Sequence, residues 1–383
     1  MRFGNIVLAG TLTLNLSCAG PQPTPSQRRL EEGMAACTET TRNYHGTPIT
    51  FCQEDDSDAL QERLDLIGRI KRYGQNRLGL IPSRNYLRYA SPRQATARRL
   101  FMLYTTPEFV IPDRWEPSRH VRSNGTNRCE EEGPCYLWGY DVDDFHDERR
   151  HYDDEGYDTY WRTTTNFGSG ADITDELFDQ ELTWWISTVF HEEFHYARMR
   201  AGRRNAWDPW VEESLASAFG HAAGLEFIRS SQNDVDLLDD DTVTDAEEQL
   251  VRQLERAAFI NEYTDRLNAL YHRDIPDEVK RDMRDGILQE AGLLGGRPIN
   301  NAYLWGTHPY TNLLDLALAV YLRNPDIEEF ACILRGAPVQ RDAVRNYLIR
   351  HGGTPAVAHP HQSDSGLRMD EFEPLLHDPQ QYQ

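Results

Sequence analysis

Residues 182–202 read LTWWISTVFHEEFHYARMRAG, and this stretch decides the fold. Its apolar residues recur with a helical period, which predicts a helix that is buried on one face and ends at Gly202. His191 and His195 are four positions apart, so they lie one turn apart on the same side, where both imidazoles can bind one divalent ion. Glu192 is rotated by about 100° from His191, a position beside the ion that suits a general base.

A second predicted helix follows closely. Residues 208–217 read DPWVEESLAS, in which an Asp-Pro pair opens the helix, and we expect this helix to end at Gly224. A catalytic zinc site needs three protein ligands and one water molecule, so two histidines are not sufficient. Two acidic residues, Glu212 and Glu213, lie near the start of this second helix, and Glu213 is 18 positions after His195.

The two helices together resemble those of the gluzincins, zinc peptidases in which two histidines come from one helix and a glutamate from the next. In the aminopeptidase branch of that superfamily, the second helix carries Trp-x-x-Glu-Gly-x-Ala. This chain has Trp210, Glu213 and Ala216 in register, with Ser214 in place of the glycine. The resemblance implies that Glu213 joins the two histidines as the third ligand of one Zn²⁺ ion, with Glu212 as the second choice.

A later segment extends the resemblance. In gluzincin aminopeptidases, a Tyr-x-x-Gly stretch opens an apolar helix, and the tyrosine hydroxyl stabilises the oxyanion of the reaction. Residues 303–310 read YLWGTHPY. The resemblance implies that Tyr303 is that donor, with His308 and Tyr310 as alternatives. A tyrosine that serves only in packing is the other interpretation.

Two departures limit what the resemblance assigns. It covers about residues 180–225 and, loosely, residues 300–322. The chain lacks the Gly-x-Met-Glu-Asn motif with which those aminopeptidases grip a free amine. Ser217 stands where the thermolysin-like branch has an aspartate that orients a histidine. The residues therefore indicate the superfamily and leave the subfamily open.

The activity implied by the resemblance is zinc-dependent hydrolysis of a peptide or protein, in which Glu192 acts as the general base on metal-bound water. Two alternatives keep the same residues. One is a catalytically inactive, peptidase-like surface lipoprotein that acts in binding or assembly. The other is an amidase that acts on the cell wall with the same zinc site. The sequence does not indicate an oligomeric state.

The N-terminus has the pattern of an exported protein. Residues 1–18 combine one basic residue with an apolar stretch too short to span a bilayer, which predicts a signal peptide. Residues 16–20 read LSCAG, which resembles the lipobox of bacterial lipoproteins, although Asn15 replaces the usual leucine. The resemblance implies a lipid anchor at Cys18, in the outer membrane or periplasm, and an ordinary cleaved signal is the alternative. Residues 19–45, Pro-rich at their start, predict a linker.

The charge of the chain narrows its possible partners. The 383 residues include 40 Lys and Arg against 62 Asp and Glu, a net charge of −22, so the chain repels phosphate and we expect no nucleic-acid partner. The same charge disfavours a polybasic membrane-surface mode. No apolar run approaches the roughly 20 residues that a membrane-spanning helix needs. The lipid anchor is therefore the only membrane contact that we expect.

Five cysteines remain besides the one expected to carry the lipid. In an oxidising compartment, Cys37 can pair with Cys52, and Cys129 with Cys135. Cys332 lies in an apolar run, which predicts a buried and inert thiol.

The remaining elements complete the expected α+β fold. Helices are predicted from a cap at residues 56–58 to Gly74 and over residues 91–105, 312–322 and 341–349, and a capping box at residues 244–247 starts another. Strands are predicted over residues 108–111, 136–140 and 157–165. The acidic residues 141–155 between them predict a solvated face, with a calcium site as the alternative.

The gluzincin resemblance implies a zincin-like arrangement of these elements within a domain that spans residues 46–350. We expect a lobe with a small mixed sheet, about residues 46–180, over the active-site helix. A mainly helical lobe, about residues 180–350, is expected to supply Glu213. Residues 351–383 predict a poorly ordered tail.

Overall fold

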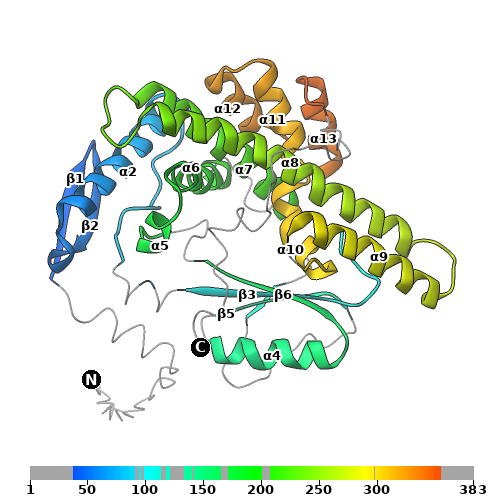
Figure 1. Cartoon of the computed structure of the whole chain (residues 1–383). Coiled ribbons are helices and arrows are strands. Elements are labelled where there is room, and N and C mark those ends of the chain that lie inside the picture. The colour runs from blue at the N-terminus through cyan, green and yellow to red at the C-terminus, as the bar shows by residue number, and fades with distance from the viewer. Residues whose placement is uncertain are drawn as a thin grey trace, which may run out of the picture.

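The computed structural model describes residues 38–90, 95, 99–113, 118–120, 133–139, 142–164, 171–200, 208–296 and 298–354. The expected signal peptide, the lipid-anchor position Cys18 and most of the expected tail lie outside these residues. Within them the fold is α+β, as the sequence predicted, and helices predominate over two small sheets (Figure 1).

The described chain opens with an antiparallel hairpin of β1 (Glu39–Tyr44) and β2 (Thr47–Cys52). Strand β1 falls inside residues 19–45, so the expected linker extends too far at its C-terminal end. Most side chains of β1 face solvent, and the strand therefore lacks the alternation of polar and apolar residues by which a sequence reveals a half-buried strand.

Helix α2 (Asp58–Asn76) follows the short helix η1 (Gln53–Asp55). It begins where the sequence predicted, because the Ser57 hydroxyl accepts a hydrogen bond from the N–H of Leu60 (3.3 Å). The buried side of α2 packs against α6 (Leu182–Arg198), the helix that carries the candidate histidines.

The larger sheet has four strands in the order β4-β5-β3-β6: β3 (Leu100–Thr106), β4 (Ser118–His120), β5 (Cys135–Gly139) and β6 (Asp158–Thr164). Strand β3 pairs antiparallel with β5 and β6, whereas β4 runs parallel to β5. The sheet is therefore mixed, as expected.

Two sequence predictions in this region are wrong. Residues 100–105 belong to strand β3 and not to a helix, since their run of aromatic and other large side chains is buried in the sheet. Residues 108–111 form a turn rather than a strand. The predicted strands 136–140 and 157–165 correspond to β5 and β6 within a residue or two.

Helices cover both faces of this sheet (Figure 1). The acidic residues expected as a solvated face form helix α4 (Val142–Asp154), whose apolar residues Phe145 and Tyr152 pack on one face of the sheet. The opposite face packs against α10 (Asn301–Thr311), where Tyr104 and Tyr136 meet Trp305 and its neighbours. The sheet therefore carries side chains from β3, β5 and β6 toward α10.

The remaining helices form the upper part of the molecule. They are α5 (Asp175–Phe178), α6 (Leu182–Arg198), α7 (Pro209–Ser231), α8 (Asp240–Tyr271), α9 (Asp277–Gly295), α11 (Leu314–Arg323), α12 (Ile327–Gly336) and α13 (Arg341–Arg350). Helix α7 continues through Gly224, where we expected its end. Helix α8 begins earlier than predicted, because Asp239 and Thr242 form its capping box. The last two predicted helices correspond to α11 and α13.

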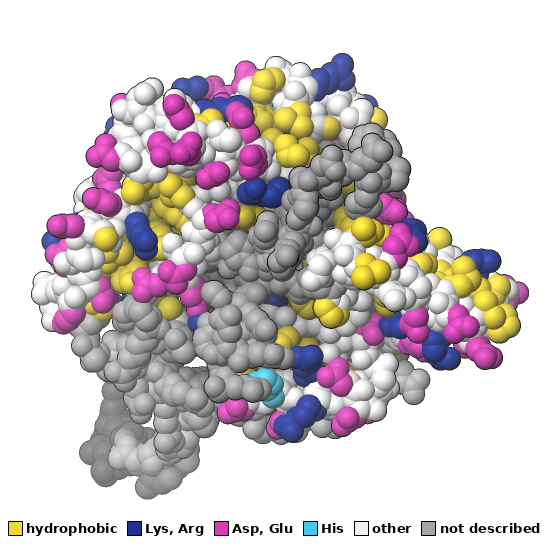
Figure 2. All heavy atoms as spheres, viewed as in Figure 1, with side chains coloured by type: hydrophobic (Ala, Val, Ile, Leu, Met, Phe, Trp, Pro, Cys, Tyr) yellow, Lys and Arg dark blue, Asp and Glu magenta, His cyan; other side chains and the backbone are white. Residues whose placement is uncertain are grey.

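Helix α6 is enclosed by α2, α7 and α8 and contributes to the largest apolar core (Figure 1). Acidic side chains are spread over the visible face of the molecule, with fewer basic ones between them (Figure 2). In the described part of the chain, no helix is both long and apolar enough to cross a membrane.

The cysteines agree in part with the expected pattern. Cys52 and Cys135 are both disulfide-bonded, whereas their expected partners, Cys37 and Cys129, lie outside the described residues. Cys332 is a free thiol and is exposed, so the prediction of a buried thiol is wrong. The apolar residues around it face the core on the other sides of α12, and Cys332 lies on the outer side of that helix.

Candidate metal centre

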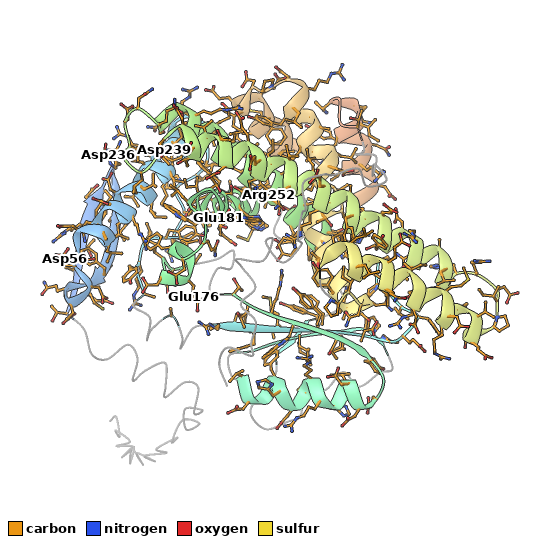
Figure 3. All side chains as sticks on the ribbon, in the orientation of Figure 1. Asp56, Glu176, Glu181, Asp236, Asp239 and Arg252 are labelled. Atoms are coloured by element: carbon orange, nitrogen blue, oxygen red, sulfur yellow. The ribbon has the colours of Figure 1, made fainter. Side chains whose placement is uncertain are left out.

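The candidate histidines lie on α6, which is buried along most of its length. His191 and His195 project from the same side, one turn apart, as the four-residue spacing predicted. At the N-terminal end of this helix, the carboxylate of Glu181 lies 3.8 Å from the guanidinium of Arg252, on α8 (Figure 3). This ion pair connects the start of α6 to the long helix that lies across it.

Helix α7 approaches α6 closely because glycine lies at the point of contact. A Cβ atom on Gly220 would be 2.5 Å from the Ser187 carbonyl oxygen and 3.2 Å from the Cβ of His191. A Cβ on Gly224, one turn later, would be 2.8 Å from the Ser187 hydroxyl oxygen. The two glycines thus set the separation of the helices, which places Glu213 of α7 beside the two histidines.

Three donor atoms converge at this point. The Nε2 atoms of His191 and His195 are 2.9 Å apart, and Oε2 of Glu213 is 3.3 Å from each of them. In the described residues, this is the one group of His, Cys, Asp and Glu side chains whose donor atoms could hold a metal ion together. Residues 142–154, where a calcium site was the alternative, contribute nothing to it.

The donor set fits one zinc ion. Ligand atoms that lie about 2.0–2.1 Å from a tetrahedral zinc ion stand about 3.3 Å apart, and the observed separations are 2.9 to 3.3 Å. Hydrogen bonds alone explain this arrangement less well. A neutral ring nitrogen offers either one proton or one lone pair, which is enough for one hydrogen bond. Each of the three atoms, the two Nε2 atoms and Oε2 of Glu213, nevertheless lies within 3.3 Å of both of the others. A shared cation satisfies all three lone pairs at once.

Glu212, the second choice for the third ligand, is engaged elsewhere. Its two carboxylate oxygens accept hydrogen bonds from Nε and Nη2 of Arg198 (2.6 and 2.7 Å). Both side chains are fully buried, and Nη1 of Arg198 also donates to the carbonyl oxygen of Leu334 (2.7 Å). The ion pair of Glu212 with Arg198 therefore connects the end of α6 to the start of α7. Glu213 is the carboxylate that faces the histidines.

The charges of Glu213 and Glu192 differ because their surroundings differ. Burial alone would raise the pKa of Glu213, but His195 and His191 hold it well below its usual value, so this carboxylate is ionised. Burial raises the pKa of Glu192 to about 7, with Glu213 and Glu193 adding to the rise and His191 opposing it. Oε2 of Glu192 is buried without a hydrogen-bond partner among the described residues.

Backbone and side-chain contacts hold this part of α6 in place. The side-chain amide of Asn85 donates a hydrogen bond to the carbonyl oxygen of Glu192 (3.1 Å). The Ser217 hydroxyl lies 3.4 Å from Nδ1 of His191, on the ring nitrogen opposite the converging one. A hydroxyl at this position can orient the His191 ring without adding charge.

Ser214, which replaces the glycine of the aminopeptidase pattern, has a structural role. Its hydroxyl donates to the carbonyl oxygen of Pro309 (2.6 Å) and accepts from the N–H of Leu313 (3.1 Å). These two hydrogen bonds fasten α7 to the end of α10. The C-terminal end of α10 is therefore held close to the metal centre.

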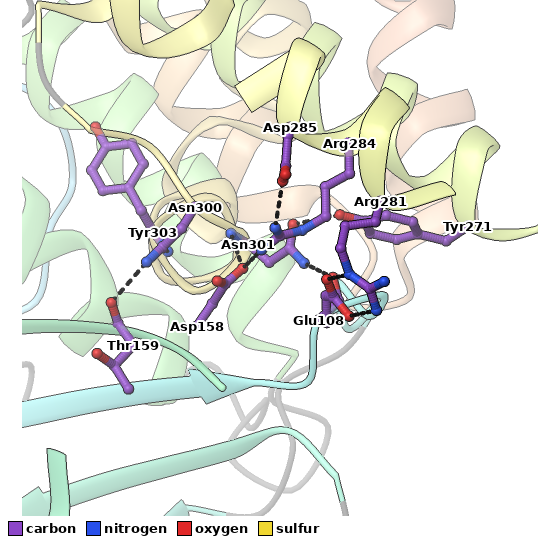
Figure 4. Close-up of polar contacts among 10 residues, drawn as sticks. All are labelled: Glu108, Asp158, Thr159, Tyr271, Arg281, Arg284, Asp285, Asn300, Asn301 and Tyr303. Carbon is purple, nitrogen blue, oxygen red and sulfur yellow. Dashed lines mark hydrogen bonds and ion pairs between the residues drawn. The ribbon is translucent and has the colours of Figure 1, made fainter. Parts of the chain in front are cut away.

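Tyr303, our first choice for the oxyanion donor, lies at the opposite end of α10. The start of that helix is attached to the sheet, where the Asn300 amide donates to the Thr159 carbonyl oxygen (2.9 Å) and the Asn301 N–H to Asp158 (3.0 Å) (Figure 4). The Tyr303 ring packs edge-on against Tyr160 at 5.0 Å. This position matches the interpretation of Tyr303 as a packing residue.

Tyr310 is the tyrosine of α10 that reaches the histidines. Its ring lies nearly parallel to that of His191, with the centroids 6.3 Å apart and the planes at 22°. Tyr303 and Tyr310 are seven residues apart, so they share a face of the helix but are separated by about 10 Å along its axis. Burial raises the pKa of Tyr310, so its hydroxyl keeps its proton. Of the two tyrosines, Tyr310 is therefore the one whose ring faces a candidate ligand.

His308, the other alternative, packs elsewhere. Its ring meets Trp210 edge-on at 4.6 Å, and burial, together with the charge of Arg341, lowers its pKa to about 3. It is a neutral packing residue next to the start of α7.

Comparisons with known proteins do not assign this site. No family model matches the chain, and neither the curated proteins nor the solved structures contain a match. The interpretation of the three converging side chains therefore depends on their own geometry and chemistry.

Some residues of the site had no signal in the sequence. Arg162, whose guanidinium donates a hydrogen bond to the Tyr310 hydroxyl (2.5 Å), comes from a predicted strand that carried no motif. Lys71, which pairs with Glu193 behind the histidines, lies 122 positions before it. Only Gly220 could have been suspected, because a glycine inside a predicted helix often marks a close approach.

Proposed function

We propose that the chain is a zinc-dependent peptide hydrolase whose metal ligands are His191, His195 and Glu213. The observation that carries this proposal is the convergence of two ring nitrogens and one ionised carboxylate within 3.3 Å of one another. Two helices hold these atoms from a buried core, so the set is preorganised. Three protein ligands leave one position for water, as catalytic zinc sites require.

Zinc bound at these residues would lower the pKa of a water molecule and polarise the substrate carbonyl group. Glu192 would act as the base that takes a proton from the attacking water molecule and as the acid that returns it to the leaving amine. Its surroundings suit this exchange, because a base with a pKa of about 7 can both take and return a proton near neutral pH. The Tyr310 hydroxyl donates a hydrogen bond to the carbonyl oxygen as negative charge develops there.

The fold supports the same proposal. The histidine helix α6 packs on α7, which supplies the carboxylate, and α10 joins α7 to the small mixed sheet; we propose that these elements form a zincin-like domain. For the cellular location, we propose export and lipid anchoring at Cys18. Both rest on the N-terminal sequence alone.

The test combines metal analysis with hydrolysis of a mixed peptide library. Wild-type chain, purified and dialysed against trace zinc, should hold one zinc per molecule and cleave library peptides. Glu192→Gln should keep the zinc and lose at least about 100-fold in turnover. Glu255→Gln, an exposed residue of α8, is the matched control and should behave as wild type.

Each alternative predicts its own result in this assay. Zinc without cleavage by the wild type favours the inactive binding protein. Cleavage of cell-wall muropeptides but not of library peptides favours the amidase. Hydrolysis that persists in Glu192→Gln, in protein free of contaminating protease, rules out the assigned general base.

A further inference from the structure

Arg162 is a cation beside the candidate metal centre. It extends from β6 on the same face of the sheet as Tyr160, and its guanidinium carbon lies 5.6 Å from the centroid of the Tyr104 ring and 4.7 Å from that of Tyr310. Nη2 donates a hydrogen bond to the Tyr310 hydroxyl (2.5 Å). Nε is buried and makes no hydrogen bond to the described residues.

No described carboxylate forms an ion pair with Arg162. Other inward-facing basic side chains, in contrast, each have one; the pairs are Lys71–Glu193, Arg99–Glu176, Arg198–Glu212 and Arg284–Asp158. The chain has 62 acidic residues, so a lack of acids does not explain the difference. Tyrosine rings offset part of the cost of burying a guanidinium, but among the described residues its charge has no carboxylate counterion.

The position of Arg162 relates this charge to the metal centre. The Tyr310 ring contacts Arg162 and also faces the His191 ring at 6.3 Å. The guanidinium and a candidate metal ligand therefore share Tyr310 as a neighbour. Neighbouring Cα atoms of a peptide are about 3.8 Å apart, so a peptide whose carbonyl group lies at the metal centre can place a carboxylate of a neighbouring residue at Arg162.

We propose that Arg162 binds a carboxylate of the substrate and so selects peptides with an anionic group next to the cleaved bond. This inference rests on the proposed function and specifies its substrate class. The carboxylate is either the C-terminal one of the peptide or the side chain of Asp or Glu. Arginine suits both, because its planar fork matches the two oxygens of a carboxylate.

Binding to the Glu192→Gln variant tests the proposal, because that variant cannot turn the probe over. The probes are N-acetyl-tetra-alanine with a free C-terminal carboxylate, the same peptide as its C-terminal amide, and two amides with Glu or Gln at the third position. Calorimetric titration into zinc-loaded protein should show at least about tenfold tighter binding of one carboxylate probe than of its neutral counterpart. Equal affinities for all four probes would overturn the proposal.

Substitution of Arg162 tests whether this preference depends on its charge. In the Glu192→Gln background, Arg162→Met should weaken the preferred carboxylate probe about tenfold to hundredfold and leave the neutral probes unchanged, whereas Arg162→Lys should restore part of the preference. Arg350→Met, at an exposed residue of α13, is the control. An equal loss for acidic and neutral probes shows that Arg162 acts only through Tyr310, which overturns the proposal.

The two proposals fail in different ways. If the wild type hydrolyses no probe but binding still prefers carboxylates through Arg162, the hydrolase proposal fails and this inference stands. If the wild type hydrolyses acidic and neutral probes equally and binds them equally, the hydrolase proposal stands and this inference fails. The probe comparison needs no Arg162 variant, so it decides the matter even if Arg162→Met does not fold.

Discussion

The ammonium group of Lys71, on α2, lies 2.7 Å from Oε1 of Glu193, on α6, and both side chains are buried. Nζ of Lys71 also donates to the Ser83 hydroxyl (3.0 Å) and to the Asn85 carbonyl oxygen (2.6 Å), and the Ser83 hydroxyl in turn bonds to Glu193. The Asn85 amide holds the carbonyl oxygen of Glu192. This cluster therefore supports the turn of α6 that carries Glu192, the proposed general base, from the side opposite the candidate ligands.

Removing the Lys71 ammonium group should lower the stability of the fold substantially. Lys71→Met leaves the Glu193 carboxylate buried without a counterion, so we expect the free energy of unfolding to fall by about 3–5 kcal/mol. Urea denaturation of the zinc-free chain measures it. Arg77→Met, at the C-cap of the same helix, is the control, because Arg77 pairs with Glu328 at 2.8 Å in an exposed position and the variant should lose at most about 1 kcal/mol. Similar losses in the two variants would mean that the buried pair is not a support.

The contact between α6 and α7 gives a second prediction. Gly220→Ala places a methyl group 2.5 Å from the backbone oxygen of Ser187, which cannot move aside as a side chain can. The helices must separate, and Glu213 then moves away from the histidines. We expect at least about a tenfold loss of zinc affinity, measured with a competing chelator, together with a lower unfolding midpoint.

A glycine elsewhere serves as the control for this substitution. Gly286 lies in α9, and a Cβ there would meet no atom within 4 Å. Gly286→Ala should raise stability by up to about 1 kcal/mol, since alanine is the better helix former, and should leave zinc affinity unchanged. Normal zinc binding in Gly220→Ala would show that the close approach of α6 and α7 does not set the ligand geometry.

Local signals predicted the elements of the site better than their arrangement. The caps at Ser57 and Asp208, and the helical period around His191, are short-range features, and the structure places the corresponding helices there. The spacing of His191 and His195 also fixes their common side on α6. These predictions needed nothing from the rest of the chain.

Errors arose where distant contacts override a local pattern. A glycine normally weakens a helix, but Gly224 lies inside α7 because α6 packs against it. Residues 100–105 followed a good helix start, yet they lie in β3 between two partner strands. The sequence also did not indicate which end of α10 approaches the histidines; in the packed fold it is the end with Tyr310, whose ring faces His191, whereas the Tyr303 ring packs on Tyr160.

The two neighbouring glutamates of α7 should respond differently to substitution. Glu213→Ala removes a candidate ligand, so we expect zinc binding to be lost while the stability of the zinc-free chain changes little. Glu212→Ala leaves Arg198 buried without its partner, and we expect it to cost about 3–5 kcal/mol of stability even without zinc. Zinc analysis and urea denaturation of both variants check this. The opposite pattern would exchange the roles of the two residues.

Acid should destabilise the fold partly through His308. Burial and the charge of Arg341 lower the pKa of His308 to about 3 in the folded chain, whereas an unfolded histidine has a pKa of about 6.5. Between these values the unfolded chain binds a proton that the folded chain does not, so this contribution to stability is complete above about pH 6.5 and falls as the pH decreases toward 3. Through this one group, the free energy of unfolding changes by at most about 1.4 kcal/mol per pH unit.

A variant isolates this contribution. His308→Gln keeps a side chain of similar polarity without the titration, so the variant should lose less stability than the wild type between pH 7 and pH 4. Urea denaturation at several pH values, in the presence of a chelator, measures the difference. Parallel stability curves for the two proteins would show that His308 is not held neutral in the fold.

The two tyrosines of α10 allow a test within one helix. Tyr310→Phe removes the hydroxyl and keeps the ring that faces His191, so kcat should fall about 10²- to 10³-fold, as for loss of one oxyanion donor, with little change in KM and in zinc content. Tyr303→Phe removes the hydroxyl of a residue about 10 Å further along the helix axis, and kcat should stay within about threefold of the wild type. A larger loss in Tyr303→Phe than in Tyr310→Phe would return the donor role to Tyr303.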